Sequence, residues 1–117
     1  MKNKPFVDRL KFAISGLNTA WASEASFRIQ VVLGLGALAI LLTLRPKAIW
    51  WALFILIIGS VLAAELFNTA LEYVVDRLHP DLHPAIARAK DCAAGAVLVL
   101  SLSALGILTV LLIERFL

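Results

Sequence analysis

Three long apolar segments constrain the fold of this 117-residue chain more than any other feature. They run approximately from Phe27 to Leu44, from Ala48 to Ala64 and from Ala93 to Ile113. Each approaches the roughly 20 residues that an α-helix needs to cross a hydrocarbon core of about 30 Å. The chain is 62% hydrophobic and only 16% charged, and a chain this small cannot bury so much apolar surface in its own interior. The sequence therefore predicts an all-α membrane protein with three transmembrane helices.

The segment before the first span has a different pattern. Apolar residues recur there at helical spacing, with polar residues on the other side. The apolar positions are Phe6, Leu10, Ala13, Ile14, Leu17 and Trp21. This pattern indicates an amphipathic helix lying at the membrane surface. We therefore expect a single domain over residues 1–117, with a surface helix at 5–24, spans at 27–44 and 85–113, and a second span at 48–78 that extends beyond the hydrocarbon.

The basic residues indicate how the spans are oriented. Most of the eleven lysines and arginines flank the start of the first span or lie between the second and third spans. Only Arg45, Lys47 and Arg115 lie on the opposite side. Because loops on the cytoplasmic side carry the excess of basic residues, we expect a multi-pass protein of the cytoplasmic (inner) membrane with its amino terminus in the cytoplasm. The basic residues are dispersed without an aromatic-basic surface, which argues against nucleic acid as a partner.

Four polar residues continue the second apolar run on one face of a helix. They are Glu65, Asn68, Glu72 and Asp76. Spacings of three, four and four residues place their side chains on one stripe. On membrane-insertion scales, placing an acidic group at the bilayer centre costs about 2.5–3.5 kcal/mol of free energy. Such a stripe therefore indicates function.

Depth along the helices brings further polar groups to the same membrane boundary. With a rise of about 1.5 Å per residue, Glu65 lies ~25 Å from the outer end of its helix. Glu24 and Asp91 lie ~30 Å and ~34 Å from the outer ends of theirs, close to the inner edge of a ~30 Å core. Carboxylates beyond that edge can hold a hydrated Mg²⁺ that shares phosphate oxygens, and Lys90 supplies the positive charge that a polyphosphate needs.

Each of these residues also has a structural interpretation. Glu65 can serve as a partner inside an oligomer, Asn68 can bond to a neighbouring helix, and Glu24 can pair with Arg28 four residues later. The other charged groups can be a solvated helix end or interfacial charges; they are Glu72, Asp76, Lys90 and Asp91. Residues 79–84 contain two histidines among prolines that break helical spacing, so we interpret them as a turn and assign no zinc site.

The motifs together are arranged as in a known family. Glu65-Leu-Phe-Asn68-Thr69-Ala70-Leu-Glu72 is followed by Asp76, by Ala89-Lys90-Asp91 and by Ala93-Ala94-Gly95-Ala96-Val97, and Glu24-Ala25-Ser26-Phe27-Arg28 comes near the start. With this combination over nearly its whole length, the chain resembles the prokaryotic diacylglycerol kinases. The resemblance implies a homotrimer of three-span subunits that transfers the γ-phosphoryl group of ATP to a lipid alcohol at the cytoplasmic face of the membrane.

The resemblance also implies roles for individual residues. Glu65 is the candidate general base, and Glu24 and Glu72 are the candidate ligands of Mg²⁺. The residues that would organise nucleotide and phosphate are Asn68, Glu72, Lys90 and Asp91. Diacylglycerol is the expected substrate. Undecaprenol is the alternative, because Ala94 stands where certain diacylglycerol-type members have a serine and Pro5 stands where they have a basic residue.

A non-enzymatic membrane subunit is the alternative from another class. An ion path needs polar groups through the full thickness of the membrane. The outer halves of the three predicted spans lack charges, and residues 31–39 and 48–58 lack serine, threonine and asparagine. We therefore favour an ATP-dependent lipid kinase over an ion-conducting or scaffold subunit.

Overall fold

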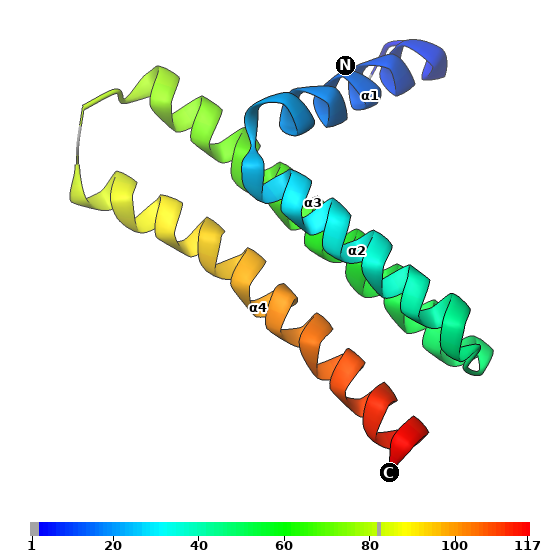
Figure 1. Ribbon diagram of the computed structural model, residues 1–117. Coiled ribbons are helices and arrows are strands. Elements are labelled where there is room, and N and C mark those ends of the chain that lie inside the picture. Colours follow the sequence, from blue (N-terminus) through cyan, green and yellow to red (C-terminus); the bar gives the residue numbers. More distant parts are fainter. Residues whose placement is uncertain (1–2, 82) are drawn as a thin grey trace.

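The computed structural model describes residues 3–81 and 83–117, and this part of the chain is folded into four helices without any strand. In chain order they are α1 (Phe6–Ser23), α2 (Ala25–Leu44), α3 (Ala48–Leu78) and α4 (Pro84–Phe116) (Figure 1). The last three are long and apolar enough to cross a membrane. The predicted all-α class, with three candidate spans and an amino-terminal helix, is confirmed.

The break between α1 and α2 occurs at one residue, Glu24, whose backbone is extended with φ −118° and ψ 107°. Helix ends leave carbonyl groups without partners. The Arg28 guanidinium satisfies two of them by donating to the carbonyls of Trp21 at 2.6 Å and Ala22 at 3.4 Å. Beyond this break α1 projects away from the other helices (Figure 1).

The apolar face predicted for α1 is not covered by the other residues that the structure describes. Its large side chains are exposed: Phe6, Leu10, Ile14, Leu17 and Trp21. Among the described helices, α1 packs against α2 and α3 but not against α4. Its apolar face is therefore available to the membrane surface.

The α3 helix is the centre of the bundle. It packs against both α2 and α4, whereas the backbones of α2 and α4 do not come into contact in the described part of the chain. Gly34 lets α2 approach α3 closely, because a Cβ atom there would lie 3.0 Å from Cγ2 of Ile58. One residue from each long helix forms the small core, and these are Leu41, Phe54 and Leu111. Most other apolar side chains face outwards, so lipid or further copies of the chain must cover them.

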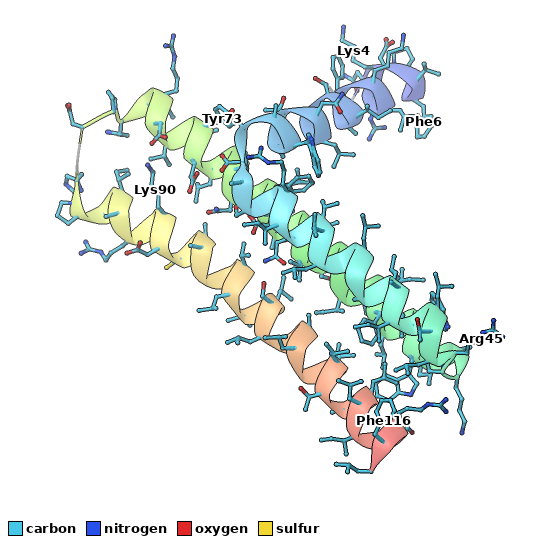
Figure 2. The ribbon with its side chains drawn as sticks, in the orientation of Figure 1. Lys4, Phe6, Arg45, Tyr73, Lys90 and Phe116 are labelled. Atoms are coloured by element: carbon cyan, nitrogen blue, oxygen red, sulfur yellow. The ribbon has the colours of Figure 1, made fainter. Side chains whose placement is uncertain are left out.

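The two ends of the bundle differ. The α2–α3 turn and the carboxyl terminus lie at one end, and α1 with the α3–α4 loop lies towards the other (Figure 1). Accordingly, Arg45 and Phe116 are far from Tyr73 and Lys90 (Figure 2). The 31 residues of α3 span about 46 Å, and the 20 residues of α2 about 30 Å. The last turns of α3 therefore extend past the level at which α2 begins.

Candidate functional site at one membrane boundary

Glu65 is a carboxylate enclosed between two helices. It lies on α3 with 3% of its surface exposed. Ser26, in the first turn of α2, donates a hydrogen bond from Oγ to Oε2 of Glu65 at 3.0 Å. Thr69, also buried, donates to the backbone carbonyl of Glu65 at 2.9 Å. The Ser26 contact places Glu65 level with the start of α2, at the boundary of the apolar span.

The second oxygen of the Glu65 carboxylate is in a different environment. Oε1 accepts no hydrogen bond within residues 3–81 and 83–117. In the same residues, the only fully enclosed polar side-chain atom without a partner is Oδ1 of Asn68. Oε1 of Glu65 is therefore not completely enclosed and keeps a small exposed area.

Asn68 lies one turn after Glu65 on the predicted stripe, and its amide oxygen Oδ1 has no donor in the described part of the chain. Leaving a buried acceptor unpaired costs about 1–3 kcal/mol. The alternative in which Asn68 bonds to a neighbouring helix is not found within the described part of this subunit. Its amide is therefore left able to bond to a ligand, to water or to another copy of the chain.

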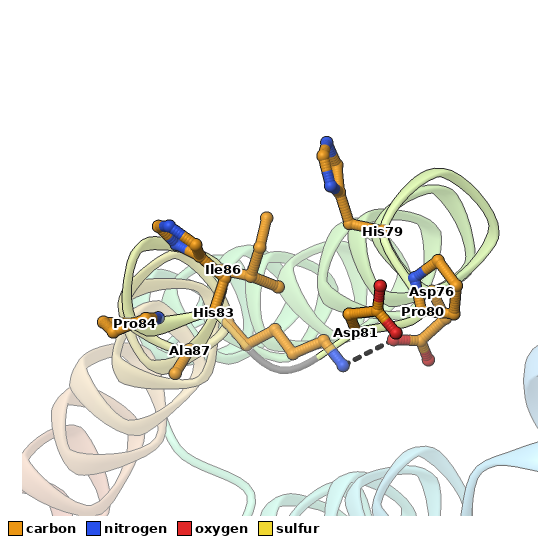
Figure 3. Close-up of a pocket in the computed structure, with 9 residues that line it drawn as sticks. Asp76, His79, Pro80, Asp81, His83, Pro84, Ile86 and Ala87 are labelled. Atoms are coloured by element: carbon orange, nitrogen blue, oxygen red, sulfur yellow. Dashed lines mark hydrogen bonds and ion pairs between the residues drawn. The ribbon is translucent and has the colours of Figure 1, made fainter.

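A second polar contact joins α3 to α4. Lys90 Nζ lies 2.5 Å from Oδ1 of Asp76, and this ion pair faces a cleft of about 360 Å³ beside the α3–α4 loop (Figure 3). The Glu72 carboxylate adds a weaker attraction to Lys90. Both partners are accessible to solvent, with 35% of the Lys90 side chain and 63% of the Asp76 side chain exposed. Asp91 is also exposed but does not line this cleft, because adjacent residues on a helix point in different directions.

The two histidines belong to the loop, as the turn interpretation predicted. His79 follows the end of α3, and His83 caps the start of α4 by accepting a hydrogen bond at Nδ1 from the backbone N–H of Ala85 at 3.0 Å. Pro84 is the first residue of α4, where a missing N–H costs nothing. Both imidazoles point away from the Asp76 carboxylate (Figure 3).

A third contact shows how deep these groups lie relative to one another. Gln30 Nε2 donates to Oγ of Ser101 at 3.0 Å, which aligns α2 with α4. On α2, Gln30 lies one turn, about 6 Å, further from the α3–α4 loop end of the bundle than Ser26. On α4, Asp91 lies about 15 Å nearer to that loop than Ser101. Lys90 and Asp91 are therefore roughly 10 Å closer to the loop than Glu65, and Glu24 is about 3 Å closer. Glu65, Glu24, Lys90 and Asp91 therefore lie within about 10 Å of one another along the bundle, in the predicted order of depth, while Glu72 and Asp76 lie about 10 Å and about 16 Å beyond Glu65 along α3.

Glu24 does not form the ion pair with Arg28 that their spacing of four residues allows. Arg28 donates to the α1 carbonyls instead, and within the residues described the one ion pair is that of Lys90 with Asp76. Glu24 stays half-buried at the junction of α1 and α2. No three His, Cys, Asp or Glu side chains gather into a protein-only metal site in the part of the chain that the structure describes. Mg²⁺ is usually bound by one or two carboxylates, with water and phosphate oxygens completing its shell, so carboxylates such as Glu24 and Glu72 have the right chemistry for this ion.

An apolar cleft of about 540 Å³ opens between α2, α3 and α4 on the membrane side of Glu65. Its lining includes Gly34, Phe54, Val61 and Ala104, and the Gln30–Ser101 pair contributes polar groups. In the described part of the chain, α2 and α4 do not come into backbone contact beside this cleft.

Ser26 is the site residue that the motif analysis did not single out. It appeared only as part of a quoted motif, and a serine near the start of an apolar helix carries no distinctive signal. It belongs to the candidate site only because Glu65 of α3 lies opposite it in the folded chain.

The fold defines a small multi-pass membrane protein whose polar side chains gather towards one end of its apolar helices. Residues 11–112 match the family described as prokaryotic diacylglycerol kinase. The chain is 36% identical over 105 residues to the diacylglycerol kinase of Escherichia coli (strain K12), covering 90% of this chain and 86% of the relative. It is 34% identical over 90 residues to the diacylglycerol kinase of Helicobacter pylori (strain J99), covering 77% and 70%.

A relative with a different name also matches. The undecaprenol kinase of Bacillus subtilis (strain 168) is 35% identical over 77 residues, covering 66% of this chain and 63% of the relative. The chain belongs to the prokaryotic diacylglycerol kinase family and is a lipid kinase. This confirms the predicted enzyme class over the ion-conducting and scaffold alternatives.

Proposed function

We propose that this chain transfers the γ-phosphoryl group of ATP to the free hydroxyl of diacylglycerol, giving phosphatidic acid at the cytoplasmic face of the inner membrane. The observation that carries the proposal is Glu65, a buried carboxylate level with the start of α2 whose Oε1 remains accessible. A lipid hydroxyl resides at that depth, whereas a water-soluble substrate would not need a base there.

In this proposal Glu65 is the general base. Its Oε1 takes the proton of the lipid hydroxyl while the hydroxyl oxygen forms a bond to the γ-phosphorus. The bond from the γ-phosphorus to the bridging oxygen breaks, and ADP leaves. Asn68, one turn along α3, offers its amide to the nucleotide or the phosphate. Such transfers depend mainly on positioning and on stabilising charge on the transferring oxygens.

Lys90 and Asp91 would act on the nucleotide closer to the loop. Lys90 can exchange Asp76 for a phosphate oxygen at small cost, because an exposed ion pair contributes little to stability. The roughly 10 Å between Lys90 and Glu65 along the bundle gives the phosphate chain room to extend towards the lipid.

Glu24 and Glu72 would hold Mg²⁺ through single carboxylate oxygens, with the remaining positions left to water and phosphate. Bound Mg²⁺ supplies positive charge that offsets the charge on the phosphate oxygens. Glu24 lies at the α1–α2 junction and Glu72 lies on α3. Both α1 and α2 pack against α3. Loss of either carboxylate should therefore raise the magnesium concentration needed for activity.

The apolar cleft offers a place for the hydrocarbon chain of the substrate, because it begins one turn below the Ser26–Glu65 contact. Both diacylglycerol and undecaprenol combine a hydroxyl with a long hydrocarbon chain. Two observations favour testing undecaprenol as the second candidate, namely the similarity to an undecaprenol kinase and the presence of Ala94.

We also infer a homotrimer with a cytoplasmic amino terminus. The unpaired Oδ1 of Asn68 and the open surface at Gly59, where an added Cβ would meet nothing within 4 Å, support contact with further copies. Native mass spectrometry in detergent would measure the stoichiometry. Orientation can be tested on Cys92, which is exposed and is the single cysteine of the chain. A membrane-impermeant maleimide should label Cys92 in inside-out but not in right-side-out vesicles.

The activity test is transfer of labelled phosphate from ATP to diacylglycerol or undecaprenol, each presented in mixed micelles. The wild type should phosphorylate diacylglycerol faster, and Glu65→Gln and Asn68→Ala should lose most of the rate. Full turnover by both variants would show that this site does not carry the reaction. Faster transfer to undecaprenol would reverse the substrate assignment.

A further inference from the structure

We propose that Ser26 is a positioning residue, whose hydroxyl holds Oε2 of Glu65 and thereby directs Oε1 towards the substrate hydroxyl. This inference rests on the proposed function, in which Glu65 is the base. It assigns a role to a side chain on α2 that does not itself meet the reacting atoms.

The contact is specific because the two oxygens of Glu65 have different surroundings. Oε2 accepts from Ser26 at 3.0 Å, while Oε1 is left without a donor in the described part of the chain. A glutamate side chain has several rotatable bonds, so a carboxylate without an anchor would sample several orientations. Fixing one oxygen leaves the other as the proton acceptor.

The break at Glu24 explains why Ser26 is free to do this. Serine and threonine hydroxyls in helices commonly bond to the carbonyl four residues earlier, as Ser23, Ser60 and Ser103 do here at 2.7–2.9 Å. For Ser26 that carbonyl is on Ala22, which belongs to α1 and accepts from Arg28 instead. With its usual acceptor turned away, the Ser26 hydroxyl points across to α3.

The experiment compares steady-state kinetics of Ser26→Ala and Ser26→Thr in mixed micelles. Ser26→Ala should lower kcat by about tenfold or more, as expected for losing a hydrogen bond to a charged group, and leave KM for ATP within about twofold. Ser26→Thr keeps a hydroxyl and should recover most of kcat. Ser103→Ala is the matched control and should behave as the wild type, because Ser103 bonds only to its own helix.

A second arm places Ser26→Ala in the Glu65→Gln background. If Ser26 acts through Glu65, removing the hydroxyl should not slow the residual rate further. An additional slowing there, an unchanged kcat in the single variant, or a failure of threonine to recover activity would each overturn the proposal. Failure of the proposed function looks different, since the wild type would then transfer no phosphate or Glu65→Gln would be fully active.

Discussion

The Gln30–Ser101 hydrogen bond joins two helices whose backbones do not touch, so its removal should loosen α4 from α2. Interhelical hydrogen bonds in membranes contribute about 0.6 kcal/mol on average and at most about 1.7. The contact is 3.0 Å long and partly buried, and among the described residues no other hydrogen bond links α2 to α4. We therefore expect a coupling energy of about 1 kcal/mol, which is a factor of about five in the unfolding equilibrium.

The two single variants should differ in cost. Ser101→Ala leaves the Gln30 amide unpaired beside an apolar cleft, with a penalty of about 1–2 kcal/mol. Gln30→Met keeps the volume, and the freed Ser101 hydroxyl can turn to the carbonyl of Val97 on its own helix. The second variant should therefore cost less than the first.

The assay is unfolding in mixed micelles by titration with sodium dodecyl sulfate, followed by circular dichroism, for the wild type, both single variants and the double variant. Ser103→Ala serves as the control because Ser103 donates to Val99 in its own helix. Its combination with Gln30→Met should be additive. A coupling energy within about 0.3 kcal/mol of zero for Gln30 and Ser101 would refute the reasoning, since additivity is expected for independent sites.

Three further predictions concern the loop end and the apolar cleft. Lys90→Met should raise KM for ATP by about tenfold, because it removes the hydrogen bond that we propose Lys90 donates to a charged phosphate. Ala104→Leu places a larger side chain in the 540 Å³ cleft and should raise KM for the lipid several-fold while leaving KM for ATP unchanged. His83→Ala removes the cap of α4, a loss of about 0.5–2 kcal/mol, and should accelerate hydrogen exchange in the first turn of that helix.

Matched variants separate these effects from general damage. Asp76→Asn should change KM for ATP much less than Lys90→Met, and equal effects would mean that the ion pair itself is what matters. Gly106→Leu adds a side chain in open space outside the cleft and should leave the lipid KM unchanged; a similar rise there would argue against the cleft as the lipid site. His83→Asn can still accept the N–H and should protect the first turn, so exchange as fast as in His83→Ala would disprove the cap.

The fold class and the relative level of the polar groups along the helices could be predicted because they depend on local properties of the chain. The length and apolar content of the segments predicted the three long helices. The rise per residue predicted how far Glu65, Glu24 and Asp91 lie along them. The alignment of α2 with α3 through Ser26, and of α2 with α4 through Gln30, reproduces the predicted order of depth. The roles of these residues in catalysis and metal binding remain predictions.

What the sequence could not determine is which side chains face one another across helices. Spacing allowed Glu24 to pair with Arg28, but the single extended residue at Glu24 turns Arg28 back to the carbonyls of α1. The same break releases the Ser26 hydroxyl for Glu65. Periodicity within one helix specifies a face but not the rotation or crossing of its neighbour. The sequence by itself therefore determined the helices and the order of their charges along the bundle, whereas the contacts that orient those charges were decided by how the helices pack.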